Sequence, residues 1–151
     1  MPVELTRNGT RGVTLPRLPR PLMAVGFKVF NVAMRLRGAQ LLTLITFGSR
    51  SQREHSVPLR WFADVDEPGA WLVVASFAGA SRHPAWYVNM ARNPDRIKVQ
   101  LNGRTFNVSA ESLAGAARAE AWQRIVADAP GYAEYQTKTD REIPIVRLKA
   151  R

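Results

Sequence analysis

The sequence predicts a small, mainly β domain of the α+β class, an antiparallel β-barrel with peripheral helices. Short runs rich in β-forming residues follow one another along the chain, at 41–47, 56–63, 70–77, 96–101, 104–110 and 143–148. Between two of these runs, Asn102-Gly103 is the pair expected of a two-residue hairpin turn. Helical stretches are few and occur singly, so the strands do not alternate with helices as a doubly wound parallel sheet requires.

Helical patterns stand beside these strands. We expect helices at 84–92, 114–129 and 132–138, and a first one at 22–36 that Gly38 would end. The first helix carries two apolar rows, Leu22, Val25, Val29, Val32 and Leu36 in one and Met23, Phe27, Phe30 and Met34 in the other. We expect these rows to pack against the core, with a wall of a substrate pocket or a contact with a membrane surface as alternatives.

The chain has 151 residues and predicts one domain with one core. Residues 1–20 mix Pro, Gly, Thr and Arg without periodicity, which indicates a flexible basic arm ahead of a single domain at 21–151. The sequence has no cysteine and two histidines, which excludes disulfides, thiolate metal sites and cysteine nucleophiles. Any redox chemistry must therefore come from a bound cofactor.

Positive charge is concentrated near the N-terminus. Of the formal net charge of +10, the first 60 residues hold ten Lys and Arg against two Glu, and the rest hold twelve against ten acidic residues. Such a field attracts nucleic acid, an acidic membrane surface or a phosphorylated or carboxylated small molecule, and composition alone does not choose among them. No apolar run approaches the ~20 residues that span a bilayer, and we expect a cytoplasmic protein.

Several common site motifs are missing. The chain has neither the glycine-rich dinucleotide fingerprint nor a P-loop, and Gly79-Ala80-Ser81-Arg82-His83 lacks the last glycine of a nucleophile elbow. His55 and His83 have no carboxylate cluster nearby, so we expect no metal site and place both at the surface or at a pocket rim.

Three segments have the composition of a ligand site. The stretch 48–53 offers hydroxyls, two arginines and free backbone amides, which suits a phosphodiester. In 75–80, an apolar strand runs into small residues that allow a flat ring or an anion to approach the backbone. Tyr132 and Tyr135 are three residues apart on one helical face, where they can stack on a planar ligand and still donate O–H groups.

Taken in order, these segments resemble the deazaflavin-dependent nitroreductase family of actinobacteria. Its pattern T-T-G-R-K-S-G-x-x-R-x-x-P-L corresponds to 46–59, and A-S-x-G-G-x-x-x-x-P-x-W-Y-x-N-L corresponds to 75–90. A third pattern, Y-P-x-Y-x-x-Y-Q-x-x-T-x-R-x-I-P-[IV]-V, is matched from Pro130 to Val146. The resemblance covers about residues 41–148 with its spacing kept.

This resemblance implies a split β-barrel, FMN-binding-like in fold, that binds the deazaflavin coenzyme F420. Such an enzyme is an F420H2-dependent reductase, which transfers hydride from C5 of the reduced ring to a quinone, an enone, a nitroaromatic or a similar acceptor. The partner implied is a small-molecule hydride acceptor rather than nucleic acid. The basic arm and the first helix would add a weak peripheral contact with a membrane.

The resemblance also implies site residues. Those implied to bind the coenzyme come from the loop 48–53, the following strand, the loop 75–80 and the next helix: Ser49, Arg50, Ser51, Val57, Pro58, Ser76, Phe77, Ala78, Gly79, Ala80, Trp86 and Asn89. Those implied to face the acceptor, as catalytic residues, are Ser76, Tyr132 and Tyr135.

This chain departs from the family pattern at several positions. Ser49 and His55 stand where the family often has Arg, Gln52 where it has Gly, and Phe77 where Lys is common. Each change removes a cation or backbone freedom near the acidic tail of the coenzyme. Ala129 replaces the first tyrosine of the C-terminal pattern, which should alter the preference for acceptors.

Two alternatives remain open from sequence alone. One is an FMN-dependent oxidoreductase with the same split barrel. The other is a module without catalysis that stores deazaflavin or docks on anionic lipid or nucleic acid through its basic arm.

Overall fold

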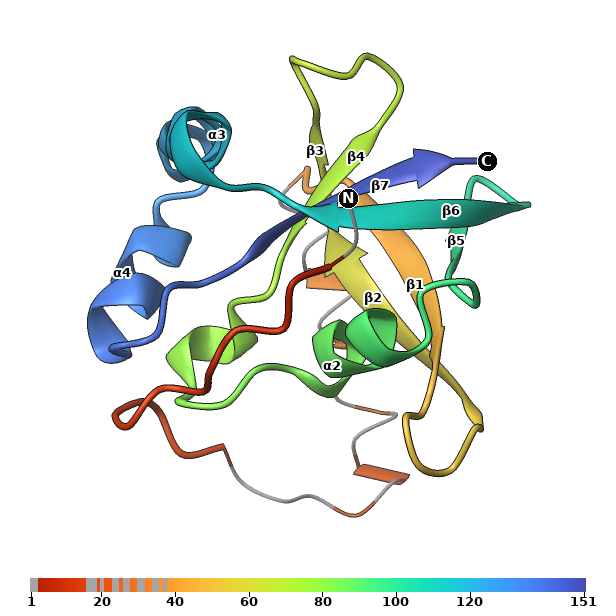
Figure 1. Cartoon of the computed structure of the whole chain (residues 1–151), viewed down its shortest axis with the longest axis horizontal. Helices are drawn as coiled ribbons and strands as arrows, with labels where there is room; N and C mark the ends of the chain where they lie inside the picture. The colour runs from red at the N-terminus through yellow and green to blue at the C-terminus, as the bar shows by residue number, and fades with distance from the viewer. Residues whose placement is uncertain are drawn as a thin grey trace.

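A computed structural model of the chain describes residues 3–15 and 38–151, together with positions 19, 21, 22, 25, 28, 29, 32, 33 and 36. One curled antiparallel sheet forms the centre, and helices flank it (Figure 1). The strands are β1 (Leu41–Phe47), β2 (Glu54–Arg60), β3 (Phe62–Ala63), β4 (Trp71–Val74), β5 (Lys98–Leu101), β6 (Arg104–Ser112) and β7 (Ile145–Ala150). The helical elements within 38–151 are η1 (Phe77–Gly79), α2 (Ala85–Arg92), α3 (Gly115–Asp128) and α4 (Gly131–Lys138).

The sheet has the strand order β2-β1-β5-β6-β7-β4-β3. β6 is the longest strand and belongs to both halves, because residues 104–107 pair with β5 and residues 108–112 pair with β7. Its partner therefore changes along its length, and β2 also comes into contact with β4. A sheet that bends in this way and closes only in part is a split β-barrel, which confirms the fold class predicted from the sequence.

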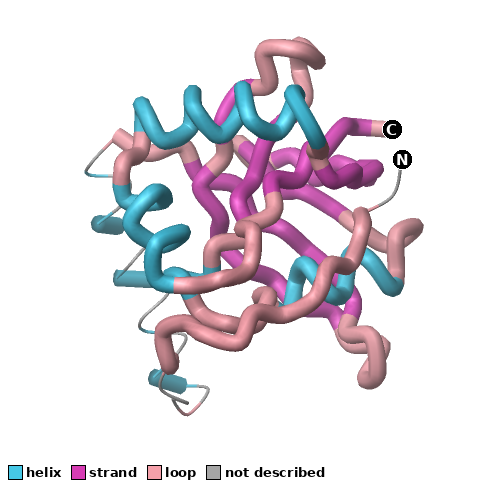
Figure 2. The backbone as a smooth tube through the Cα atoms, turned by 60° about the vertical axis from the view of Figure 1, so that its left-hand side comes forward, coloured by secondary structure: helices cyan, strands magenta, loops and turns pink. Residues whose placement is uncertain are grey.

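Alternation along the strands produces two apolar clusters. In β4, Val73 faces the cluster inside the curled sheet, where Tyr87 and Met90 of α2 also pack. Leu72 and Val74 face the opposite side and pack under Ile125 of α3. Figure 2 shows α3 and α4 on one side of the strands. The two helices therefore cover one face of the sheet while α2 covers the other.

Two predicted strands end earlier than the sequence indicates. The run at 56–63 is two strands, because the chain leaves β2 at Trp61, whose N–H donates to the carbonyl of Gln40, and then joins β4 as β3. The run at 70–77 stops at Val74, because the backbone turns into η1 with positive φ angles at Phe77 and Ala78. The other predicted strands and the helices after residue 84 are confirmed to within a few residues, and Asn102-Gly103 forms the expected turn with φ angles of 52° and 76°.

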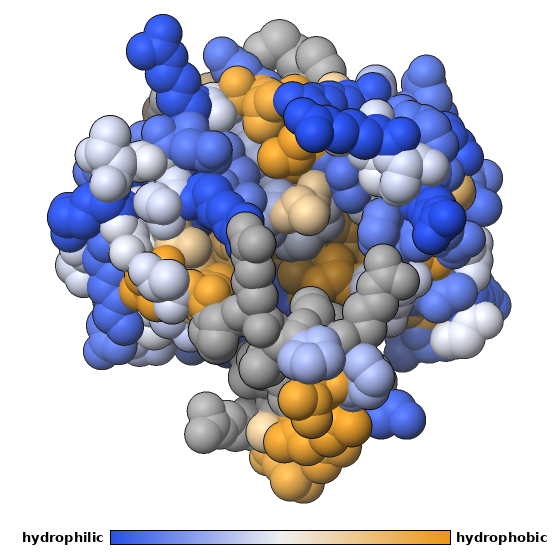
Figure 3. All heavy atoms as spheres, turned by 90° about the horizontal axis from the view of Figure 1, so that it is seen from below, coloured by the Kyte–Doolittle hydropathy of each residue, from blue (hydrophilic) through white to orange (hydrophobic). Residues whose placement is uncertain are grey.

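The first predicted helix does not pack as expected. Its described positions 21, 22, 25, 28, 29, 32, 33 and 36 are helical and all exposed. The predicted packing of one row against the core is therefore wrong, since its members Leu22, Val25, Val29, Val32 and Leu36 are between 56% and 83% exposed. The second row lies outside the described residues. Figure 3, the view from below, shows apolar atoms that project at the lower edge of the molecule.

The described part of the arm, residues 3–15, has no helix or strand, as expected, but it is bound to the domain along its length. Glu4 accepts a hydrogen bond from Tyr87, and Thr10 and Arg11 donate backbone N–H groups to Asp140. Val3 is 6% exposed and belongs to the inner apolar cluster. This stretch is therefore packed onto the domain.

Candidate coenzyme and acceptor site

The turn between β1 and β2 is closed by its own backbone. Gly48 N–H donates to Arg53 O at 2.8 Å, and Gln52 N–H donates back to Gly48 O at 3.0 Å. Gln52 adopts a left-handed φ of 54°, a conformation that glycine adopts more readily. Gln52 thus takes a left-handed conformation at the position where the family pattern has Gly.

Asn89 of α2 connects this turn to β1 through hydrogen bonds. It is 6% exposed, its Oδ1 accepts from the Ser49 N–H at 3.3 Å, and its Nδ2 donates to Thr46 Oγ1 at 3.2 Å. Asn89 therefore lies at the turn, and both ends of its amide contact protein. Trp86, the other predicted residue of this helix, is 8% exposed and belongs to the inner apolar cluster.

Arginines gather around the turn. Arg50 is exposed at its tip, Arg92 Nη1 donates to Ser49 Oγ at 3.3 Å, and Arg96 Nη1 donates to Gln52 Oε1 at 2.9 Å. The Arg96 guanidinium also lies 3.7 Å from the centre of the Phe47 ring. Among the ion pairs between described residues, none includes Arg50, Arg53, Arg92 or Arg96.

These cations are suited to an anionic ligand, because guanidinium groups without carboxylate partners can fork onto phosphate or carboxylate oxygens. Arg92 and Arg96 were not predicted as site residues from the sequence. They lie some forty residues from the turn along the chain, and only the packing of α2 on β1 brings them to it.

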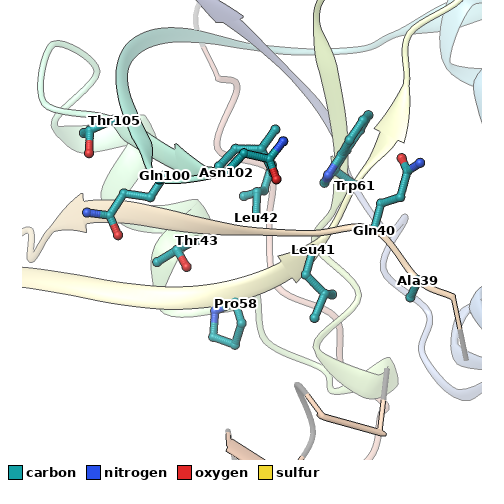
Figure 4. A pocket seen from close by; sticks show the side chains of 12 residues that line it. Ala39, Gln40, Leu41, Leu42, Thr43, Pro58, Trp61, Gln100, Asn102 and Thr105 are labelled. Carbon is teal, nitrogen blue, oxygen red and sulfur yellow. The ribbon is translucent and has the colours of Figure 1, made fainter. Parts of the chain in front are cut away.

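The two predicted residues of β2 lie on opposite faces of the sheet. Val57 pairs with the buried Leu44 and packs against the inner cluster. Pro58 pairs with Thr43 on the outer face, where both line a cavity of about 770 Å³ (Figure 4). The remaining lining residues include Trp61, Gln100 and Asn102, and none of the described residues in the lining is charged. Val57 and Pro58 therefore cannot both reach one flat ring with their side chains.

The second predicted loop is bent sharply. Phe77, Ala78 and Gly79 take positive φ angles of 44°, 53° and 81°. A Cβ on Gly79 would lie 2.7 Å from the Tyr135 carbonyl, so this position requires glycine. Ser76, Phe77 and Ala78 are partly exposed, whereas Gly79 and Ala80 are buried. The first three residues of the loop are therefore accessible to a ligand, and the last two pack against protein.

The predicted tyrosines lie beside this loop on α4. Their ring centres are 6.0 Å apart in an edge-to-face arrangement, and Tyr132 also meets the Phe62 ring edge-to-face at 5.9 Å. Burial raises the pKa of Tyr132 to about 12, with the nearby Arg60 opposing the shift and Tyr135 adding to it. The phenol of Tyr132 therefore stays protonated near neutral pH and can act as a hydrogen-bond donor.

His83 is buried at 5% exposure, so its predicted place at a surface or pocket rim is wrong, whereas His55 is exposed as expected. His83 Nδ1 lies 3.3 Å from Arg141 Nη1 and Nε2 lies 3.0 Å from the Thr6 carbonyl. Because a guanidinium only donates, Nδ1 accepts and the ring proton is on Nε2. Burial, and then the charge of Arg141, lower the pKa of His83. No cluster of potential metal ligands occurs among the described residues.

The structure thus arranges most of the predicted residues in two groups, whereas Trp86 and Val57 pack at the inner cluster and Pro58 lines the outer cavity. The turn 48–53 with Asn89 forms one group, and η1 with Tyr132 and Tyr135 forms the other. Figure 1 shows the β1–β2 turn and η1 on either side of α2. An elongated ligand with an anionic end and a planar end matches this arrangement, which is that of a cofactor-binding split-barrel oxidoreductase.

Comparisons with known proteins agree with this class. Residues 21–150 match the family model described as F420H(2)-dependent quinone reductase. An F420H(2)-dependent quinone reductase of Mycobacterium tuberculosis is 33% identical over 125 residues, covering 80% of this chain and 81% of that protein. A solved F420-H2-dependent reductase, FDR-A, is 37% identical with a TM-score of 0.62, covering 73% of this chain and 94% of that one. Another solved structure, described as a domain-swapped dimer, is 32% identical with a TM-score of 0.62, covering 85% and 99%.

The chain belongs to the F420H(2)-dependent quinone reductase family. It is an oxidoreductase that uses the coenzyme F420, and its hydride acceptor is a small molecule of the quinone kind. The expected split barrel, coenzyme and reaction class are confirmed. Family membership favours this interpretation over the FMN-dependent and non-catalytic alternatives. Of the helices that the structure describes, none has the length and apolarity to cross a membrane.

The buried His83 predicts a pH dependence of stability. Its pKa is depressed in the folded protein, so the unfolded chain takes up a proton first as the pH falls below about 6.5. Stability should therefore be full above that pH and decline from there toward the lowered native pKa. The groups facing the ring are Arg141, Tyr87 and Thr6, of which Arg141 carries charge.

Thermal unfolding between about pH 7.5 and about pH 5 measures this dependence in the window of an unperturbed histidine. His83→Asn retains an acceptor for Arg141 and removes the titrating ring, so its unfolding temperature should change less than that of the wild type across this window. His55→Asn removes the exposed histidine and should keep the wild-type dependence. An equal pH dependence in the wild type and His83→Asn would contradict the assignment.

Proposed function

We propose that reduced F420 lies between the β1–β2 turn and η1, with its phosphodiester at the turn and its ring against 76–80. Arg50, Ser49 and Ser51 would bind the phosphodiester. The observation that supports this most strongly is the group of arginines around the turn that form no ion pair with another described residue. Arg92 and Arg96 would extend the cationic surface toward the acidic tail of the coenzyme.

The residues present suit such a coenzyme in two further respects. The hydroxyls of Ser49 and Ser51 accompany the guanidinium groups at the turn, and phosphate oxygens accept hydrogen bonds from both kinds of donor. At η1, Ser76, Phe77 and Ala78 are partly exposed, and the small side chain of Ala78 suits the approach of a flat ring. When bound, reduced F420 supplies the hydride; the protein orients it and excludes water.

We further propose that Ser76, Tyr132 and Tyr135 face the quinone. Hydride delivery to a quinone leaves negative charge on a carbonyl oxygen, which a nearby O–H donor stabilises. Tyr132 and Tyr135 adjoin η1, because a Cβ on Gly79 would contact the Tyr135 backbone. Among these donors, Tyr135 is the less enclosed by apolar rings, since Tyr132 also packs against Phe62.

Replacing Tyr135 with Phe tests this role, because the ring remains and only the donor is lost. Turnover with a quinone acceptor should fall by roughly 10- to 1000-fold, the range for losing one donor to a developing oxyanion. The affinity for F420, titrated by its fluorescence, should stay nearly unchanged. If Tyr135→Phe and Ser76→Ala each keep full turnover, these residues only pack and the proton comes from water.

The exposed apolar face of the first helix supports a contact between this protein and a membrane surface. Its exposed apolar residues recur at spacings of three and four, which places them on one face. The first 60 residues add the positive charge that anionic lipid attracts. A quinone acceptor is itself apolar, so this contact would bring the enzyme to a supply of acceptor. We propose a weak, peripheral association on this basis.

Sedimentation with vesicles of phosphatidylglycerol and phosphatidylcholine tests the contact. Val29→Ser should lower the bound fraction several-fold, and added salt should lower it further because exposed charges are screened beyond ~8 Å. Val65→Ser is the matched control, since Val65 is 62% exposed and Val29 is 63% exposed. Equal binding of the wild type and Val29→Ser would show that this helix face does not touch lipid.

A further inference from the structure

The described part of the arm runs across the loop that leads from η1 into α2 (Figure 1). Gly9 N–H donates to Ser81 O at 2.6 Å, and Val13 N–H donates to Gly79 O at 3.0 Å. Val13 also forms a parallel bridge with Ala80. The arm thus binds the backbone of the same loop that the proposed function puts against the coenzyme.

Gly12 shows how closely the two backbones approach. A Cβ at this position would lie 2.6 Å from Ala80 C and 2.8 Å from Gly79 O. These atoms are main chain and cannot move aside as a flexible side chain could. Gly12 is therefore required by the approach of the arm to the loop.

Arg141 holds the loop from the opposite side. It is 4% exposed, and its guanidinium donates to Ala80 O at 2.9 Å, Ala75 O at 3.1 Å and Ser76 O at 2.8 Å. These carbonyls flank the three residues with left-handed φ angles. Its planar fork of N–H donors suits three convergent acceptors, which an ammonium group could not satisfy in the same geometry.

His83 joins the arm to Arg141. Its ring contacts Thr6 through Nε2 and Arg141 through Nδ1, and its backbone N–H donates to Asn8 Oδ1 at 3.0 Å. Arm, histidine and arginine thus form one connected set of hydrogen bonds around η1. A loop with consecutive left-handed residues persists only when its surroundings determine it, and this set provides the surroundings.

We propose that residues 3–15 and Arg141, called here the loop clamp, are positioning elements that hold Ser76–Ala80 in the conformation that binds F420. This inference rests on the proposed function, in which that loop contacts the coenzyme. A loop already held in its bound shape loses less conformational freedom on binding, so affinity rises without any new contact to the ligand. The loop clamp itself does not touch the coenzyme.

The first test replaces Gly12 with Ala in the full chain. Hydrogen exchange of the protein without coenzyme should become at least tenfold faster at residues 79–81, and the dissociation constant for F420 should rise about tenfold. Gly131→Ala is the control, because a Cβ there meets no atom within 4 Å. It should leave both quantities unchanged.

The second test compares Arg141→Lys with Arg118→Lys. Arg118 also donates to a carbonyl, that of Ile143 at 2.6 Å, and burial likewise lowers its pKa, but it does not contact 75–80. Both variants should lower the unfolding temperature. Only Arg141→Lys should speed exchange at 76–81 and weaken F420 binding about tenfold, so a general loss of stability is distinguished from loss of positioning.

Unchanged exchange at 76–81 in both Gly12→Ala and Arg141→Lys would overturn the loop clamp. Faster exchange with wild-type affinity for F420 would overturn its role in positioning the coenzyme loop. Failure of the wild type to bind F420 would instead refute the proposed function, and the exchange measurement would still report whether the arm and Arg141 hold the loop.

Discussion

The Arg141 guanidinium is buried, and its hydrogen bonds to protein go to main-chain carbonyls and a histidine nitrogen. A buried charge is tolerated only when polar groups surround it, so the backbone around it must present its carbonyls inward. Three such carbonyls come from the segment between β4 and α2. This requirement explains why β4 ends at Val74 and why the residues after Ser76 bend through left-handed conformations.

The curled sheet determines what this bend can reach. β6 pairs with one half of the sheet and then with the other, and the turn after β1 and the segment after β4 lie on either side of α2. α2 is connected to both the segment after β4 and the β1–β2 turn. It begins just after the loop that Arg141 holds, and it carries Asn89 and Arg92 to the β1–β2 turn. A single coenzyme can therefore contact cations at one end and the bent loop at the other.

Local patterns predicted most of the fold because they depend on neighbours in sequence. The helix at 115–128, the Asn102-Gly103 turn and the strand at 41–47 follow from periodicity and turn chemistry alone. The end of β4 could not be predicted, because the group that bends the chain there lies more than sixty residues away. The exposed face of the first helix was also unpredictable, since an apolar row looks the same whether it meets a core or a membrane.

The candidate site was predicted in outline through its loops, and its supporting residues were not. Arg92 and Arg96 were not predicted as site residues and His83 was placed at a surface or pocket rim, because their contacts with the loops depend on packing. The most direct test of the site is hydrogen exchange of the wild type with and without F420. Protection at 48–53 and 76–81 is expected, whereas protection confined to the cavity lined by Thr43, Pro58 and Gln100 would contradict the account.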